Sequence, residues 1–201
     1  MSRYLNPYEE IHKAEAGKLP HWQQDDVMQF VTFRLADSIP QSLLRSIKRE
    51  RDEWVAHHPQ PWSQAESSEY FELFHQKLDG VLDQGLGECC LRDPKVRAIL
   101  EDVFMRGHGV VAALHAWVIM PNHVHLVFSP HEQIGTVIKA WKGASSHRIG
   151  RGAIWQKNYF DRMIRDRAHF QRVVRYIRRN PRGLELSQYS LWEGPLALSV
   201  G

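Results

Sequence analysis

The stretch WVIMPNHVHLVFSP, residues 117–130, limits the possible folds of this chain more than any other stretch. Pro121 and Asn122 separate two apolar runs, and this pair of residues is typical of a tight connection. The runs on either side, 109–120 and 123–129, are rich in the Val, Ile and Phe side chains that strands favour. The sequence therefore predicts a β-hairpin, which needs more strands and a layer of helices to bury its apolar side chains.

Two histidines lie in the second strand of this hairpin. Side chains alternate between the two faces of a strand, so His123 and His125 point to the same face and Val124 points to the other. Neutral imidazoles are common ligands of metal ions, and two on one face can hold a single ion. The spacing alone leaves a second reading open, in which both are partly buried histidines hydrogen-bonded within the hairpin.

The other elements follow from apolar periodicity, prolines and caps. We expect strands or extended segments at 27–35 and 153–160, and helices at 41–56, 66–84, 94–106, 133–149 and 166–180. With the hairpin, this order predicts an α+β fold, a ferredoxin-like antiparallel sheet sandwiched with helices, which we place on one face of the sheet.

We expect a single domain, 1–201, because the chain is 43% hydrophobic with seven tryptophans and shows no repeats. Residues 1–25 are expected to form an irregular arm, and the tail 184–201 has no clear pattern. The segment 41–106 is too long for one crossover helix, so we interpret it as a helical insertion after the first strand.

The composition also indicates the compartment. The chain has no apolar run of about 18 residues, so no membrane span is expected. Its first residues lack the pattern of a secretory signal, and its two cysteines, Cys89 and Cys90, are neighbours that rarely bridge. These observations favour a reducing compartment, the cytoplasm, and a place beside the nucleoid if the partner is DNA.

The charge of the chain is distributed very unevenly. Residues 139–182 hold thirteen Lys and Arg side chains against Asp161 and Asp166, a formal charge of +11, whereas the rest of the chain carries −8. Such asymmetry favours a polyanion partner, most often a nucleic acid. Arginine outnumbers lysine ten to three, and its planar guanidinium suits phosphate oxygens. The alternative is an ordinary solvated basic helix surface.

The last helix carries a second set of polar groups. At about 100° per residue, Phe170, Val173 and Ile177 share an apolar face, and Tyr176 lies at its flank. Asn180 follows one turn later on the same flank. A tyrosine at this position is often only a boundary residue. Together with the paired histidines it suggests phosphoryl transfer, in which the tyrosine oxygen attacks a backbone phosphate beside a metal ion.

Two motifs carry a resemblance to a known family. MPNHVHLVF, followed about 50 residues later by RYIRRNP, resembles the histidine-hydrophobic-histidine (HUH) single-tyrosine transposases, and within them the REP-associated tyrosine transposases. The segments LPHWQQDDVMQFVTFRLADSIP and GAIWQKNYFDRMIRD resemble the same branch, so the resemblance extends over nearly the whole chain.

The resemblance implies a site and a reaction. It implies His123 and His125 as ligands of a divalent metal, Mg²⁺ or Mn²⁺, and Tyr176 as the nucleophile that forms a 5′-phosphotyrosine and frees a 3′-hydroxyl. Insertion-sequence relatives have a glutamine as third ligand where this chain has Asn180, a shorter amide whose oxygen suits a hard cation.

The resemblance also implies a partner, single-stranded DNA with hairpins like those of repetitive extragenic palindromes. The side chains expected to hold its backbone are Lys139, Lys142, Arg148, Arg165, Arg172, Arg175 and Arg179. Unpaired bases are expected to stack on Trp141, Trp155 or Tyr159, although Trp141 suits a core position equally well. The branch tends toward monomers and insertion-sequence relatives toward dimers, so a monomer is expected and a dimer stays open.

Other enzyme classes with paired histidines fit the sequence less well. Histidine-triad enzymes need a third alternating histidine where this chain has Val127, and two-histidine phosphoesterases need a repeated motif with a hydroxyl residue that is missing here. A zinc hydrolase needs a third ligand, for which His147 is the best spare. Two alternatives remain: a catalytically silent protein that binds DNA or RNA hairpins, and Tyr159 as the nucleophile.

Overall fold

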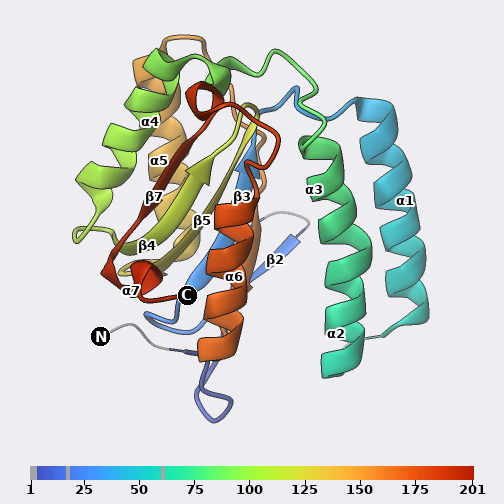
Figure 1. Ribbon diagram of the computed structural model, residues 1–201. Helices are drawn as coiled ribbons and strands as arrows, with labels where there is room; N and C mark the ends of the chain where they lie inside the picture. The colour runs from blue at the N-terminus through green and yellow to red at the C-terminus, as the bar shows by residue number, and fades with distance from the viewer. Residues whose placement is uncertain (1–3, 17–18, 60–61) are drawn as a thin grey trace.

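The computed structural model describes residues 4–16, 19–59 and 62–201 (Figure 1). Five antiparallel strands form the main sheet in the order β6-β3-β5-β4-β7. These strands are β3 (Gln29–Arg34), β4 (Ala112–Ile119), β5 (His123–Pro130), β6 (Phe160–Met163) and β7 (Ser190–Glu193). The predicted hairpin is confirmed as β4 and β5, where the Met120 amide donates to the His123 carbonyl at 2.8 Å. The four strands β3 to β6 lie in the ferredoxin-like order, which confirms the α+β expectation.

Helices cover both faces of this sheet. The helices α4 (Pro94–Gly107) and α5 (Ile134–Ile149) pack on one face, against the side chains of Phe33, Leu126 and Phe128. The helix α6 (Arg167–Arg179) and the short α7 (Pro195–Leu198) pack on the other, against Phe30 and Val127. The expectation that helices cover one face only is therefore wrong, because α6 buries its apolar side chains against the opposite face of the sheet.

The expected insertion 41–106 divides into two parts. Helix α4 is the crossover helix of the ferredoxin-like unit. The side chain of its N-cap residue Asp93 accepts a hydrogen bond from the Lys95 backbone amide at 2.8 Å. The helices α1 (Gln41–His57), α2 (Gln64–Tyr70) and α3 (Lys77–Leu82) form a separate hairpin beside the sheet and α6 (Figure 1). A π-helical turn, Phe71–Gln76, joins α2 to α3, so the single helix predicted at 66–84 is a continuous helical run with one irregular turn.

Three segments differ from the sequence expectations. The arm 1–25 contains a two-stranded ribbon, β1 (His12–Ala16) and β2 (Leu19–Gln23). The tail contains a 3₁₀ turn, Leu186–Gln188, followed by β7 and α7. Residues 153–160 make one isolated bridge, Leu35 to Trp155, and the strand β6 starts only at Phe160. The strands β1, β2, β6 and β7 are short and lack apolar alternation. Their pairing in the folded chain therefore determines them, and no local sequence pattern does.

A further 3₁₀ turn, Cys90–Arg92, precedes α4. Within the described ranges, no helix is long and apolar enough to cross a membrane.

Candidate active site

Strand β5 places His123 and His125 on the sheet face that α6 covers, and both side chains have no exposed surface. Burial lowers the pKa of His123 to about 4 and lowers that of His125 well below its ordinary value of 6.5. A buried imidazole without a paired charge prefers its neutral form. Both rings are therefore neutral near pH 7, which is the form that can bind a metal ion.

The neighbouring Asn122 determines which nitrogen of His123 carries the proton. Its amide nitrogen donates to the carbonyls of Leu82 and Leu86, both at 3.1 Å, at the end of the helical insertion. Its Oδ1 therefore faces Nδ1 of His123, at 2.8 Å, and accepts a hydrogen bond from it. The lone pair of His123 is left on Nε2, which is buried and has no hydrogen-bond partner among the described residues.

His125 is held in a similar way from strand β3. Its Nδ1 lies 2.7 Å from the hydroxyl of Thr32, the residue directly opposite it in the sheet. Its ring stacks on Phe30 with 5.8 Å between centroids. These contacts aim Nε2 of His125 at helix α6, where it lies 3.3 Å from the hydroxyl oxygen of Tyr176.

Helix α6 brings the expected tyrosine and asparagine to these histidines. Tyr176 and Asn180 are one turn apart, and the Asn180 amide nitrogen donates to the Tyr176 hydroxyl at 3.3 Å. Oδ1 of Asn180 is buried without a hydrogen-bond partner in the described part of the chain. The four residues expected from the sequence, His123, His125, Tyr176 and Asn180, thus lie together in the structure.

Two further residues belong to this cluster and were missed in the sequence. The Tyr176 hydroxyl donates to Oδ2 of Asp79 at 2.6 Å, and the same oxygen lies 2.8 Å from Nδ1 of His75. Both come from the helical insertion and are buried. Their spacing of four residues beside the apolar Phe74 and Leu78 is the one signal that would have pointed to them.

The charges of this cluster are strongly coupled. Burial opposes ionisation of Asp79, but His75, His125 and the hydrogen bond from Tyr176 together lower its pKa to about 2. Burial and the nearby Asp79 carboxylate raise the pKa of the Tyr176 hydroxyl above its ordinary value. Near pH 7 the site therefore pairs a carboxylate with a protonated phenol.

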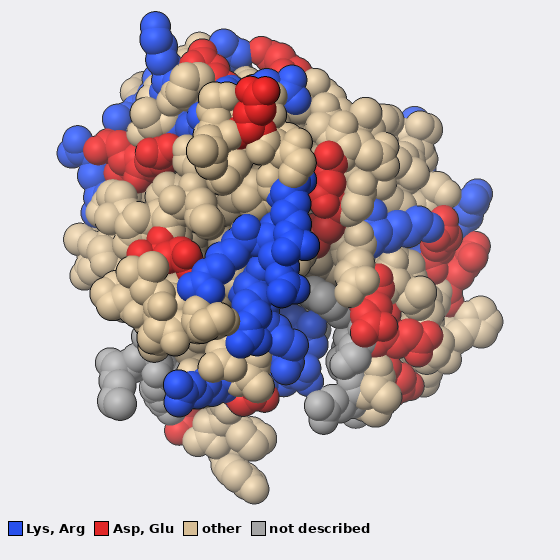
Figure 2. Space-filling model, in the orientation of Figure 1, with Lys and Arg blue, Asp and Glu red and all other residues tan. Residues whose placement is uncertain are grey.

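Lysine and arginine side chains form a continuous column over helix α6 (Figure 2). The expected arginines Arg165, Arg172, Arg175 and Arg179 all lie on this helix or just before it. Arg172, Arg175 and Arg179 are exposed. Arg178 is different, since its guanidinium is bound by Glu193 and by the carbonyls of the C-terminal segment. The column is therefore an exposed cationic surface beside the Tyr176 cluster.

The other expected cations lie on α5, which packs on the opposite face of the sheet. The Lys142 ammonium donates to the carbonyls of Gln156 and Asn158, and burial lowers its pKa to about 8. Arg148 pairs with Asp102, and Lys139 is exposed. The structure thus separates Lys139, Lys142 and Arg148 from the arginines of α6.

Several alternative residues do not reach the cluster. Trp141 and Trp155 are buried in the core under α5, so the expectation that bases stack on them is wrong. Tyr159 stacks on His21 with 4.0 Å between centroids, and its hydroxyl has no bond to either β5 histidine. His147 is exposed on α5.

The side chains present fit a divalent cation. His123 and Asn180 both direct unpartnered buried atoms, Nε2 and Oδ1, into this cluster, and both β5 imidazoles are neutral. Among the described residues, no three or more His, Cys, Asp or Glu side chains are grouped to hold an ion by themselves. An ion held here would therefore depend on two histidines and on oxygens from Asn180, water or phosphate.

Comparison with known proteins relates this cluster to one family. The family described as "Transposase IS200 like" matches residues 94–180, the segment that contains both β5 histidines, Tyr176 and Asn180. Through these residues, the chain is similar to the IS200-like transposases over less than half of its length. The matched segment leaves out α1 to α3, and with them Asp79 and His75.

Two individual proteins are similar to the chain. The REP-associated tyrosine transposase of Escherichia coli (strain K12) is 30% identical over 101 residues, which cover 45% of this chain and 61% of that protein. The chain therefore matches less than two thirds of that relative's length. A solved structure of a REP-associated tyrosine transposase bound to a REP hairpin aligns with 90% of this chain and 93% of that one, at 16% identity and a TM-score of 0.46.

Proposed function

We propose that the chain nicks and joins single-stranded DNA at hairpins like those of repetitive extragenic palindromes, through a 5′-phosphotyrosine on Tyr176. One observation carries the proposal: the Tyr176 hydroxyl lies between a carboxylate at 2.6 Å and a neutral imidazole at 3.3 Å. An acid–base partner within hydrogen-bond reach is the arrangement that activates a hydroxyl nucleophile.

The proposed step begins with the neutral phenol, because burial and Asp79 keep the proton on Tyr176. The phenolic oxygen forms a bond to phosphorus, and the bond from phosphorus to the 3′ oxygen breaks. The phenolic proton passes to Asp79, which already accepts its hydrogen bond. The departing 3′ oxygen takes a proton from water and leaves as a 3′-hydroxyl. Rejoining runs the same steps in reverse with another 3′-hydroxyl as nucleophile.

The proposed ligands of a divalent cation, Mg²⁺ or Mn²⁺, are His123, His125 and Asn180. A bound cation would polarise the phosphate and stabilise charge on its oxygens. Asn122 and Thr32 engage Nδ1 of the two imidazoles, which leaves Nε2 of His123 without a partner among the described residues and turns Nε2 of His125 toward the Tyr176 hydroxyl. Asn180 also donates to the Tyr176 hydroxyl, which links the ligand set to the nucleophile.

The exposed arginines of α6 are proposed to hold the DNA backbone next to the nucleophile. Guanidinium groups in a row neutralise consecutive phosphates without reading sequence. Lys139, Lys142 and Arg148 are proposed only as contacts for a DNA segment that reaches the α5 side of the sheet. The DNA of the cell is then the substrate, and the cytoplasm is where we expect the protein to act.

The proposal is tested with a hairpin oligonucleotide that has single-stranded flanks, incubated with Mn²⁺ and analysed on denaturing gels. We expect cleavage together with a protein band that carries covalent DNA, and loss of both in Tyr176→Phe. Tyr159→Phe changes the rival tyrosine and should keep both. DNA binding without cleavage, for every substrate and metal tried, would favour the catalytically silent hairpin-binding protein instead.

A further inference from the structure

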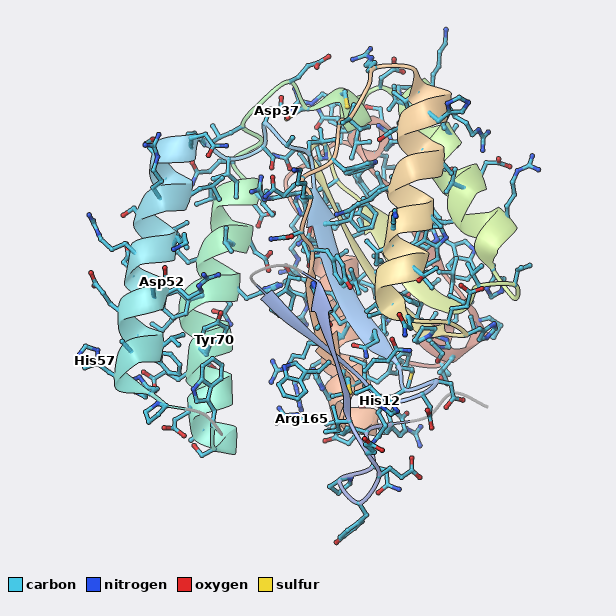
Figure 3. All side chains as sticks on the ribbon, turned by 180° about the vertical axis from the view of Figure 1, so that it is seen from behind. His12, Asp37, Asp52, His57, Tyr70 and Arg165 are labelled. Carbon is cyan, nitrogen blue, oxygen red and sulfur yellow. The ribbon has the colours of Figure 1, made fainter. Side chains whose placement is uncertain are left out.

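A cavity of about 350 Å³ lies between the helical insertion and the edge of the sheet. Helices α1 and α3 supply one side, and strand β3 with residues 156–160 supplies the other (Figure 3). Asp79, which accepts the hydrogen bond of Tyr176, lines this cavity, and so does Thr32, which contacts His125. Any ligand in the cavity therefore lies next to the candidate active site.

The walls of the cavity suit a flat aromatic ligand. Phe74 is buried, and Tyr70 and Phe160 are partly buried, so three rings contribute to one lining. Leucine and isoleucine side chains complete the apolar part: Leu44, Ile47, Leu78 and Leu82. The volume lies within the range of about 300–1,000 Å³ that small-ligand pockets occupy.

The segment before β6 adds polar groups to this lining. The side-chain amides of Gln156 and Asn158 are partly buried and have no hydrogen bond within the described ranges. Their main-chain carbonyls are fixed by the Lys142 ammonium, at 2.9 and 3.0 Å. An amide offers a donor and an acceptor side by side, which is the pattern on the edge of a nucleobase.

A cation lies in the same lining. The Arg34 guanidinium is partly buried, and its Nη1 donates to the Leu35 carbonyl and the Ser38 hydroxyl. In the part of the chain that the structure describes, Nε and Nη2 of Arg34 make no hydrogen bond. Lys48 and Arg51, also at the cavity, both pair with Asp52. Arg34 therefore has donors left for an anionic group of a ligand.

We propose that this cavity binds one unpaired nucleotide of the DNA strand, next to the phosphate that Tyr176 attacks. The base packs against the aromatic wall and its edge meets Gln156 and Asn158, while Arg34 faces the phosphate of that nucleotide. The choice of a nucleotide as ligand rests on the proposed function. The insertion then has two roles, since it supplies Asp79 to the nucleophile and a wall to the nucleotide site.

The test measures binding and needs no cleavage. Tyr176→Phe protein is titrated with a hairpin DNA whose single-stranded flank is replaced by an abasic site at one position after another. We expect one flank position whose abasic form binds roughly fivefold to a hundredfold more weakly than intact DNA, the effect of losing one stacked base. Adding Gln156→Ala and Asn158→Ala should weaken binding of intact DNA and cause little further loss with that abasic DNA.

Gln76→Ala is the matched control, because Gln76 is an exposed amide of the same insertion that does not line the cavity. Equal binding at every abasic position, or unchanged affinity after loss of both amides, overturns the nucleotide site. Thermal unfolding of the variants checks that the fold is kept. If wild-type protein binds DNA with the expected abasic pattern but forms no covalent adduct, the proposed function fails and the cavity proposal stands. If no DNA binds, both fail.

Discussion

The hydroxyl of Tyr176 and the carboxylate of Asp79 share a hydrogen bond of 2.6 Å across 97 positions of the chain. This bond joins helix α6, which belongs to the segment matched to the transposase family, to an insertion outside that segment. The candidate nucleophile is therefore oriented by a part of the chain that the family match does not cover.

We predict that Asp79→Asn slows single-turnover cleavage by about a hundredfold or more, because removing a general base typically costs at least that factor. The rate is measured at saturating DNA, because Asp79 also lines the cavity proposed for a nucleotide and its replacement can change DNA affinity. Glu72→Gln is the matched control: Glu72 is an exposed carboxylate in the π-helical turn of the same insertion, without a hydrogen bond to Tyr176. Wild-type cleavage rates in Asp79→Asn would contradict a role in proton transfer.

A second prediction concerns metal binding. Thr32→Val keeps the shape of the side chain and removes the hydroxyl that contacts Nδ1 of His125. Loss of such an outer hydrogen bond typically weakens metal affinity by about tenfold to a hundredfold. Isothermal titration calorimetry with Mn²⁺ and no DNA measures this directly. Thr136→Val, at an exposed position on α5, should bind like the wild type. Equal affinities in both variants would contradict a role of Thr32 in positioning His125 as a ligand.

A third prediction concerns stability and pH. Burial lowers the pKa of His115, His123 and His169 to about 4 from the ordinary value of 6.5. Between pH 6.5 and pH 4 these histidines therefore bind protons in the unfolded chain but not in the folded chain. Their contribution to the free energy of unfolding is fully present above pH 6.5 and is lost progressively toward pH 4. Urea unfolding without metal should show a falling free energy of unfolding over that range. His147→Gln replaces an exposed histidine and should show the same pH dependence of the free energy of unfolding. A free energy of unfolding that does not change with pH would contradict the burial of these rings in their neutral form.

A fourth prediction concerns the number of chains in one site. Tyr176 lies 3.3 Å from His125 of the same chain, so one copy assembles the candidate site. One variant carries Tyr176→Phe, and a second carries both His123→Ala and His125→Ala. A mixture of the two should stay inactive, since neither chain has a complete site. Each variant mixed with wild type is the control for inhibition. Recovered cleavage in the first mixture would show that the tyrosine acts on the site of a second copy.

The sequence was most informative where local rules are strong. Alternation along β5 predicts that His123 and His125 share a face, and the spacing of four residues predicts that Tyr176 and Asn180 share a helix flank. The structure brings these two pairs together. Their chemical roles depend on the resemblance and stay predictions.

Other features depend on tertiary contacts that no local pattern reports. Asp79 approaches Tyr176 because the insertion folds back against the sheet. In the sequence, Asp79 is simply a polar residue beside the apolar residues of its own helix. Strand β7 has four residues and pairs with β4 at the sheet edge. Trp141 satisfies a stacking pattern and a core pattern equally well, and the packing of α5 decides for the core.

The central claim is that Tyr176 attacks DNA, and mass spectrometry of the covalent adduct tests it most directly. Wild-type protein is incubated with hairpin DNA and Mn²⁺, the DNA is trimmed with nuclease, and the modified residue is located by peptide fragmentation. The account predicts a nucleotide remnant on Tyr176, attached through its 5′ phosphate. A remnant on Tyr159, or tight DNA binding with no modified residue at all, would contradict it.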